Sequence, residues 1–266
     1  MSTHFRRHAW WIYILIFLFT QLLAGFGVAA LQHSGLGTSL QAGSSLAAAM
    51  FCANLLGILL FFCFRPQTIT WSGTLAGLRG RKGRRSGLVF LLALPITMLV
   101  NLGQEVFFPD IPNLVGDDIF RELMFDPLGL LTVCLIGPVC EELLFRGGVQ
   151  TDISQHHSNQ GWMVPILLSS LLFSIAHLNP AQMPIALILG LLLGFAYWWT
   201  GSLFASICIH VFNNSFASLL GILSPDDDSL VHFLGGPEPA GITALVCLFL
   251  LYILLRAVQK EGFQEV

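Results

Sequence analysis

The chain has 266 residues, of which 55% are hydrophobic and only 10% are charged, and its mean hydropathy is +0.76. Such a composition is typical of a polytopic membrane protein and excludes an ordinary soluble globular domain. The formal net charge is −3 and the sequence contains no basic domain, so we expect the lipid bilayer as a partner and no nucleic acid.

Eight apolar windows are candidates for membrane-spanning helices, since a helix needs about 20 residues to cross roughly 30 Å of hydrocarbon. The windows are residues 9–31, 46–64, 87–108, 128–148, 162–178, 184–200, 202–223 and 239–257. The first has a basic start and is longer than the apolar part of a signal peptide, so we expect it to be retained as a span. The pattern predicts an all-α polytopic membrane protein with about eight transmembrane helices, in which residues 1–266 form a single membrane domain.

The distribution of Lys and Arg predicts the orientation of the chain, because basic residues favour cytoplasmic loops. Residues 65–86 hold six of the twelve basic residues and no acidic residue. Arg6 and Arg7 precede the first window, and Arg256 and Lys260 follow the last. With eight spans all three groups lie on one side, so we expect an integral protein of the cytoplasmic (inner) membrane with both termini in the cytoplasm.

The fourth window ends in the stretch "CEELLFRGG", which contains Glu141, Glu142 and Arg146. Charged side chains at membrane depth are costly and are most often functional. Glu142 and Arg146 are four residues apart, so they share one helix face in the order that favours a salt bridge. Glu141 points about 100° away and is left as a carboxylate available for chemistry. The alternative is an interfacial salt bridge with Glu141 merely reaching water.

Two further polar clusters lie in the fifth and seventh windows. "FSIAH" places Phe173 and His177 one turn apart, and "HVFNN" places His210 and Asn214 four residues apart on one face. A single histidine in a membrane helix is more often a helix-to-helix hydrogen bond than a catalyst. Two histidines, an amide and a surplus carboxylate on three spans instead favour an active site, in a polar catalytic cavity between the fourth, fifth and seventh helices.

Other polar residues near these clusters carry weaker signals. Ser170 and Ser174 share a face with His177, which leaves a serine–histidine mechanism open, although small hydroxyls are ordinary in packed membrane helices. Asn213 is adjacent to Asn214 but faces away from the side of the helix that carries the motif. None of these three residues is counted among the expected site residues.

The stretches "EELLFR", "FSIAH" and "HVFNN" resemble the three motifs of the CAAX protease and bacteriocin-processing (CPBP, also called ABI) family of intramembrane proteases. Those motifs are E-E-x-x-x-R, F-x-x-x-H and H-x-x-x-[ND]. Each is weak alone, but all three occur here in the family's order and on the expected spans. The resemblance covers residues 128–223, which we expect to be the catalytic motif-bearing core, and the eight-span arrangement also fits the Rce1-like members.

The resemblance implies an endopeptidase whose cavity lies in the membrane and opens to the cytoplasm. Its substrate would be a membrane-anchored protein or peptide, cleaved near one end. In the role assignment usual for the family, Glu141 and His177 would activate water, and His210 and Asn214 would stabilise the oxyanion. The supporting residues of the motifs would be Glu142, Arg146 and Phe173.

The cofactor and the function each have an alternative. A catalytic zinc would take Glu141, His177 and His210 as ligands and keep an open fourth position. Asparagine is a poor fourth ligand, so the metal-free chemistry of a glutamate-type protease is favoured. The alternative functions are a non-proteolytic membrane regulator or scaffold of the same family and a proton-relaying transporter, and the sequence shows no inverted repeat of the kind that transporters have.

One expectation conflicts with simple helix geometry. If the fifth helix starts at Trp162, His177 lies about 22 Å along it at 1.5 Å per residue, deeper than Glu141 or His210. The levels agree only if the fourth helix continues beyond Gly148 into the cytoplasm or if the fifth begins outside the hydrocarbon. The sequence allows either.

Overall fold

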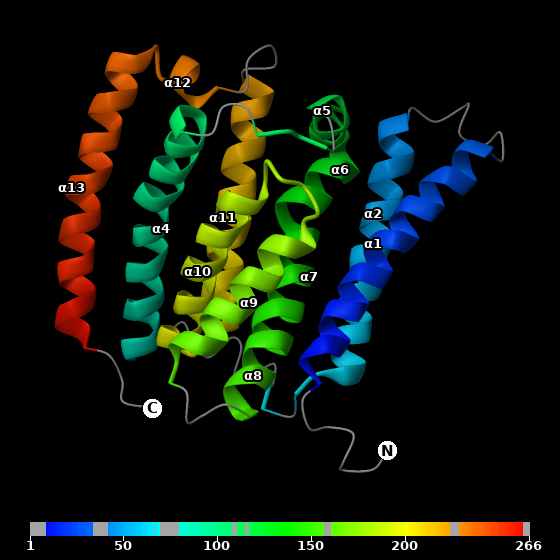
Figure 1. The fold of residues 1–266 in the computed structure, drawn as a ribbon, viewed down its shortest axis with the longest axis horizontal. Coiled ribbons are helices and arrows are strands. Elements are labelled where there is room, and N and C mark those ends of the chain that lie inside the picture. The colour runs from blue at the N-terminus through cyan, green and yellow to red at the C-terminus, as the bar shows by residue number, and fades with distance from the viewer. Residues whose placement is uncertain are drawn as a thin grey trace.

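The computed structural model describes residues 9–33, 42–66, 68–69, 80–107, 111–114, 117–156, 161–223 and 229–262. Every regular element within those ranges is a helix, and the long helices run side by side as a bundle (Figure 1). The long helices are α1 (Trp10–His33), α2 (Ala42–Phe64), α4 (Gly80–Phe107), α10 (Met183–Thr200), α11 (Leu203–Leu223) and α13 (Pro237–Glu261). The shorter ones are α5 (Asp117–Phe125), α9 (Met163–Ala176) and α12 (Leu230–Phe233).

The fourth predicted window lies in a composite helix from Pro127 to His156, called the fourth span below. Its parts are α6 (Pro127–Leu131), a π-helical segment (Thr132–Ile136), α7 (Gly137–Glu142), a second π-helical segment (Leu143–Gln150) and α8 (Thr151–His156). Segments of π-helix are rare and occur mostly at functional sites. Here they flank α7, the short helix that carries Glu141 and Glu142.

Seven helices in the described chain are long and apolar enough to cross a membrane, namely α1, α2, α4, the fourth span, α10, α11 and α13. Each overlaps a window predicted from the sequence, which confirms an all-α polytopic membrane protein. The remaining window, 162–178, corresponds to α9. This helix has 14 residues and is about 21 Å long, so it falls short of the roughly 30 Å of hydrocarbon.

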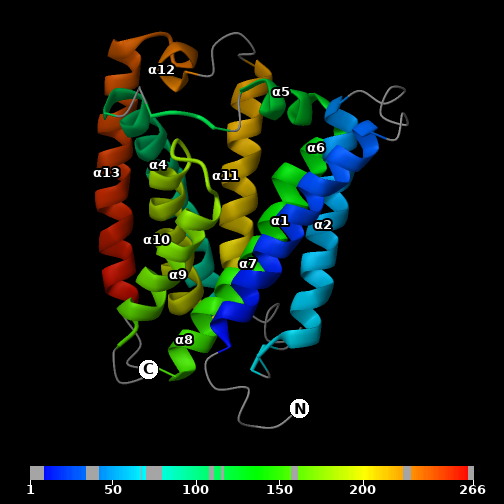
Figure 2. The same ribbon diagram turned by 45° about the vertical axis from the view of Figure 1, so that its right-hand side comes forward.

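The helix α1 begins and α13 ends at the same end of the bundle, where α4 also begins (Figure 1). Four basic residues, Arg81, Lys82, Arg84 and Arg85, lie at the start of α4, so we call this the basic end. From the basic end α9 rises and turns back through residues 177–182 before it reaches the level of the far ends of α4 and α11 (Figures 1 and 2). The helices α9 and α10 therefore form a hairpin that turns inside the bundle.

The fourth span removes the conflict in depth between the predicted catalytic residues. It continues past Gly148 as far as His156, and α8 lies at the basic end near the start of α9 (Figures 1 and 2). Glu141 lies 15 residues before His156, and His177 lies 15 residues after Trp162, so each is about 22 Å from the basic end of its own helix. The continuation of the fourth helix beyond Gly148, which the first of the two explanations requires, is thus observed.

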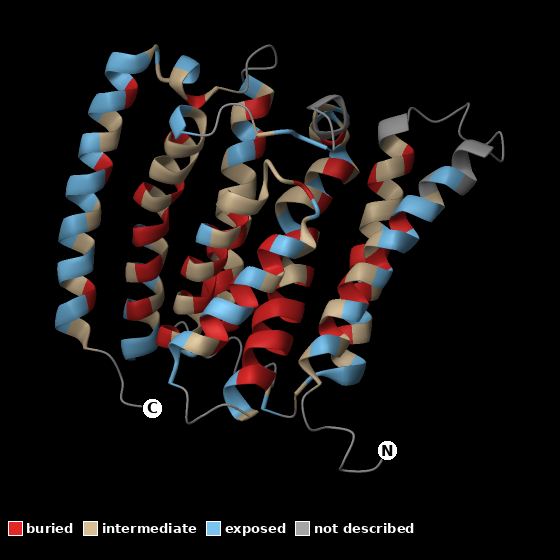
Figure 3. Ribbon diagram, in the orientation of Figure 1, coloured by how far each residue is buried: buried red, intermediate tan, exposed pale blue. Residues whose placement is uncertain are grey.

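Burial is concentrated on the fourth span. Figure 3 shows buried residues gathered along its half nearer the basic end, whereas α13 at the edge of the bundle is mostly exposed. Tyr13 of α1, Phe61 of α2, Phe145 of the fourth span and Phe173 of α9 belong to one hydrophobic cluster. The fourth span is thus the central element against which α1, α2 and α9 pack.

Candidate active site

The structure contains the salt bridge that the spacing of Glu142 and Arg146 favours. Arg146 Nη1 lies 3.0 Å from Glu142 Oε1, and neither side chain has exposed surface. Arg146 Nη2 also donates to the Gly190 carbonyl oxygen at 3.1 Å, and the guanidinium carbon lies 4.5 Å from the ring centroid of Phe173. Because a carboxylate, a carbonyl and an aromatic face all contact this cation, Arg146 holds the fourth span against α9 and α10.

His210 of α11 lies between the two glutamates. Its Nδ1 is 3.0 Å from Glu142 Oε1, and its Nε2 is 3.7 Å from Glu141 Oε2. Because a carboxylate oxygen accepts hydrogen bonds, Nδ1 carries the hydrogen that His210 donates to Glu142. The side chain of Glu141 is 19% exposed and that of Glu142 is 0% exposed, so of the two glutamates only Glu141 is open to water or to a substrate.

Phe173 brings the two histidines to one place. Its ring lies edge-to-face with His177 at a centroid distance of 4.8 Å and with His210 at 5.7 Å. His177 Nδ1 donates to the Phe173 carbonyl oxygen at 2.8 Å, which leaves Nε2 of His177 as an acceptor. His177 and Glu141 both lie in the described part of the chain, and no nitrogen of His177 lies within 4.0 Å of a Glu141 carboxylate oxygen. Two groups that share one water do not need to contact each other.

Asn214 lies one turn after His210 on α11 and contacts the fourth span. Its Nδ2 donates to the Val133 carbonyl oxygen, in the first π-helical segment, at 3.0 Å. Asn213 Nδ2 donates to Asn214 Oδ1 at 3.3 Å, and Thr97 Oγ1 of α4 donates to Asn213 Oδ1 at 3.3 Å. This chain of hydrogen bonds orients the Asn214 amide. Asn213 was not among the expected site residues, and the doubled asparagine was the only sequence signal for it.

Two glycines let α10 lie close to its neighbours. A Cβ on Gly190 would lie 3.1 Å from Ser170 Cβ, and one on Gly194 would lie 3.0 Å from Gln150 Oε1. The close approach allows Arg146 and Gln150 of the fourth span to donate to the Gly190 and Gly194 carbonyl oxygens at 3.1 and 3.0 Å. Small residues four apart are a common device for packing membrane helices, and here they support the buried arginine.

The two serines near His177 are engaged elsewhere. Ser170 Oγ donates to the Ile166 carbonyl oxygen and Ser174 Oγ donates to the Met183 carbonyl oxygen, both at 2.7 Å. Because each hydroxyl hydrogen is held by a backbone carbonyl, this arrangement disfavours the serine–histidine mechanism.

The side chains of Glu141, His177 and His210 are not gathered as a set of zinc ligands in the described part of the chain. Among the residues that the structure describes, no three side chains of His, Cys, Asp or Glu lie close enough together to hold a metal ion. Glu141, His177 and His210 would have to move to become a set of ligands. The amide oxygen of Asn214, the atom that could act as a fourth ligand, accepts a hydrogen bond from Asn213 Nδ2.

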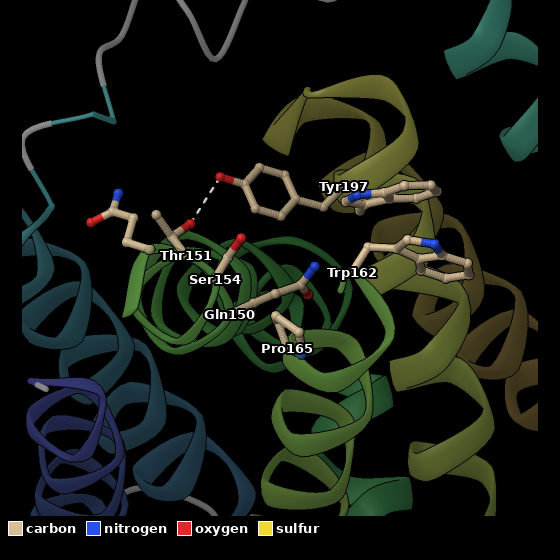
Figure 4. A pocket seen from close by; sticks show the side chains of 8 residues that line it. Gln150, Thr151, Ser154, Trp162, Pro165 and Tyr197 are labelled. Carbon is tan, nitrogen blue, oxygen red and sulfur yellow. Dashed lines mark hydrogen bonds between the residues drawn. The ribbon is translucent and has the colours of Figure 1, made fainter. Parts of the chain in front are cut away.

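A cavity of about 180 Å³ opens at the basic end of the bundle, between the fourth span, α9 and α10. Figure 4 shows Gln150 and Thr151 on one side of it, with Tyr197 and Trp162 opposite. The Tyr197 hydroxyl lies 2.9 Å from Thr151 Oγ1, and Trp162 stacks on Trp198 at 4.3 Å. None of the predicted catalytic residues lines this cavity, so a catalytic cavity around them stays a prediction.

The site as described can supply a partly exposed carboxylate, an imidazole with an available Nε2, a second imidazole between two carboxylates and an oriented amide. Groups of these types at one place are the components of general acid–base hydrolysis.

Comparisons with known proteins agree with this description. Residues 123–216 match a family model described as type II CAAX prenyl endopeptidase Rce1-like. Over 142 residues the chain is 25% identical to the membrane-embedded CAAX protease MroQ of Staphylococcus aureus (strain USA300), a match that covers 52% of this chain and 56% of that protein. The chain thus matches little more than half the length of this curated relative. No solved structure matches the chain.

The family model spans Glu141, Arg146, His177, His210 and Asn214, which means that all three motifs lie inside the matched segment. The relative is likewise a membrane-embedded CAAX protease. Residues 123–216 of the chain are therefore similar to the Rce1-like (CPBP) family of CAAX proteases.

Proposed function

We propose that this protein is an intramembrane endopeptidase that hydrolyses a peptide bond near the end of a membrane-anchored protein or peptide. The observation that carries the proposal is the position of His210. It lies between the exposed carboxylate Glu141 and the buried pair of Glu142 and Arg146, beside the Phe173 ring that also contacts His177. We further propose that the protein lies in the cytoplasmic (inner) membrane with the basic end in the cytoplasm.

Glu141 and His177 are the proposed base for water. Glu142 is engaged by Arg146 and His210, whereas Glu141 is partly exposed, so Glu141 is the carboxylate able to receive a proton. Nε2 of His177 accepts a hydrogen bond from the same water. The water oxygen bonds to the scissile carbonyl carbon, its proton passes to this base, and the carbonyl electron pair moves to the oxygen. The C–N bond then breaks, and the proton passes to the leaving amine.

His210 and Asn214 are the proposed oxyanion donors. The Asn214 amide has two N–H groups, and the one that does not donate to Val133 is available to the substrate. His210 uses Nδ1–H for Glu142, so donation from Nε2 requires the doubly protonated ring. In that form the positive ring stabilises the oxyanion that develops beside it.

The proposed chemistry is metal-free, and it is tested separately from the activity itself. We expect the purified protein to contain no stoichiometric zinc and to keep its cleavage rate after treatment with a chelator. Zinc at one equivalent, lost together with the activity, would overturn the metal-free proposal and leave the protease proposal standing.

The experiment that tests the protease proposal is comparative proteomics of new protein termini in membranes that contain either the wild type or Glu141→Ala. We expect a set of membrane-anchored substrates cleaved only in the wild type. Purified protein should then cleave peptides from these substrates, and matched peptides with a prenylated end or with a transmembrane anchor identify the preferred anchor. If the two sets of termini are the same while cells still need the protein, it acts instead as a non-proteolytic regulator.

A further inference from the structure

The turn that joins α9 to α10 has an unusual backbone immediately after His177. Leu178 adopts a φ of +52°, and it is the one residue other than glycine with positive φ in the described chain. L-residues rarely adopt this left-handed conformation, and helices that end in it usually place glycine there. Leucine in this position stays only where the surroundings hold it.

Asn179 is the residue that holds the turn. Its side chain is fully buried, with Nδ2 donating to Asn113 Oδ1 at 2.9 Å and Oδ1 accepting from the Leu114 backbone N–H at 3.1 Å. Its own carbonyl oxygen accepts from the N–H groups of Gln182 and Met183 at 3.0 and 3.1 Å. One side chain therefore joins the segment 111–114, which follows α4 in sequence, to the turn that starts α10.

Two further bonds fix the same turn from other helices. Gln104 of α4 donates from Nε2 to the Ala181 carbonyl oxygen at 3.0 Å. Ser174 of α9 donates from Oγ to the Met183 carbonyl oxygen at 2.7 Å. The turn is thus held by α4, by the segment 111–114 and by α9 at once, which is more than a connection between two helices requires.

The orientation of His177 depends on this turn. His177 is the last residue before Leu178, and its backbone N–H bonds to the Ser174 carbonyl oxygen at a long 3.3 Å. The Leu178 N–H bonds to the Ile175 carbonyl oxygen at 3.1 Å, so α9 ends in bonds that span three residues and not four. If the turn relaxed, the Nδ1 bond from His177 to the Phe173 carbonyl oxygen at 2.8 Å would be lost. The orientation of the imidazole ring, and with it the position of Nε2, would then no longer be fixed.

We propose that Asn179 is a positioning residue for His177, and that segment 111–114 controls catalysis through it from the end of the bundle opposite to the basic end. This inference rests on the proposed function, because it takes His177 as the residue that accepts from water. The bonds of Asn179 fix the left-handed turn, the turn fixes the end of α9, and the end of α9 fixes the imidazole.

The test combines Asn179→Ala with Asn113→Ala and Asn113→Asp. Asp at position 113 keeps the acceptor for Asn179 Nδ2, whereas Ala removes it. The matched control is Ser44→Ala, which removes a side-chain bond to Asp126 at the same end of the bundle and touches neither α9 nor α10.

We expect Asn179→Ala to lower kcat by about 10- to 100-fold with KM changed less than about threefold, since small misplacement of a catalytic group has effects of this size. Asn113→Ala should show a smaller loss, and Asn113→Asp and Ser44→Ala should match the wild type.

A second readout needs no cleavage. The imidazole resonances of His177 in protein labelled at histidine, assigned with His177→Ala, should shift in Asn179→Ala and in Asn113→Ala but not in Ser44→Ala. If Asn179→Ala does not fold, Asn113→Ala, on an exposed segment, carries the same test.

The outcomes separate the two proposals. Unchanged kcat and unchanged His177 resonances in folded Asn179→Ala and Asn113→Ala overturn the positioning role. Equal losses of kcat in Asn113→Ala, Asn113→Asp and Ser44→Ala also overturn it, because they indicate general destabilisation. If the wild type cleaves nothing but the His177 resonances shift in Asn179→Ala, the role of the turn is supported and the protease function is contradicted.

Discussion

The fourth span and α13 are both long apolar helices. In an 18-residue window of each, the mean hydropathies are 1.9 and 2.3, yet 50% of the first window is buried inside the protein and only 11% of the second. The difference lies in the side chains that interrupt the apolar sequence. The fourth span carries Glu142, Arg146 and Gln150 with almost no exposed surface, whereas α13 presents exposed leucines such as Leu245 and Leu248. Hydropathy finds both spans, and buried polar residues mark the one around which the site is built.

Replacing one carboxylate in each region should give the largest difference, which is measured in the cleavage rate. Glu141→Gln keeps the size of the side chain but removes the proposed base, and we expect the cleavage rate to fall by about 10²–10⁴-fold. The control is Glu261→Gln at the end of α13, where Glu261 Oε1 pairs with Arg84 Nε at 2.8 Å. Its cleavage rate should be unchanged. Equal losses of cleavage rate in the two variants would show that Glu141 is not the base.

Replacing the buried arginine should cost the most stability. Arg146→Met leaves the Glu142 carboxylate buried beside His210 alone, so we expect the free energy of unfolding in detergent to fall by about 3–5 kcal/mol. Arg256→Met on α13, where the side chain is exposed and lies over Tyr252, should change it by less than about 1 kcal/mol.

A double variant sharpens this comparison. Glu142→Gln with Arg146→Met removes both charges, and it should be less destabilised than Arg146→Met alone. A double variant that is more destabilised than the single one would show that the ion pair itself, and not the orphaned charge, determines the loss.

Adding one methyl group tests packing in the two regions. A Cβ on Gly148 would overlap with the Tyr13 ring, so Gly148→Ala forces apart the fourth span and α1. We expect a loss of about 1–3 kcal/mol in the free energy of unfolding. Gly241 of α13 has nothing within 4 Å of the added atom, so Gly241→Ala should be neutral or stabilising. Equal effects would indicate that α13 is packed against a partner.

The smallest effect is expected at the N-terminus of the fourth span. Hydrogen bonds from the Gly129 N–H and from Ser44 lower the pKa of Asp126 below its ordinary value of 3.8, with a minor opposing effect of burial. Asp126→Ala should lower the free energy of unfolding by about 0.5–2 kcal/mol at neutral pH, as removal of a helix cap does.

The pH dependence of this effect follows from the lowered pKa. A depressed pKa stabilises the folded state above the unfolded-state pKa, and the stabilisation is lost as pH falls through the folded-state value. The difference between the wild type and Asp126→Ala should therefore be constant above about pH 5 and shrink below about pH 4. A difference that grew on acidification would contradict this origin.

Patterns local to one helix were predictable from the sequence. The windows located the helices, and the four-residue spacing of Glu142 and Arg146 indicated their salt bridge, because helix geometry alone decides which side chains share a face. The bond from His210 to Glu142 was not predictable, since it depends on how α11 packs against the fourth span. The link from Thr97 through Asn213 to Asn214 was missed for the same reason.

The depth of the site also required the structure. Sequence windows end where hydropathy falls, so the fourth was placed at residues 128–148, and the polar residues of α8 concealed the continuation of the helix to His156. The two π-helical segments leave no recognisable pattern in a run of apolar residues.

The shortness of α9 has a consequence for the surrounding lipid. At 14 residues this helix spans about 21 Å, and its exposed side chains Leu167, Leu171 and Ile175 face outwards from the bundle. A bilayer of ordinary thickness exceeds that length, so acyl chains beside α9 must compress or tilt to meet it. We therefore expect hydrophobic mismatch at α9, the helix that precedes His177. We therefore expect the thickness of the bilayer to affect the conformation of the turn that Asn179 holds.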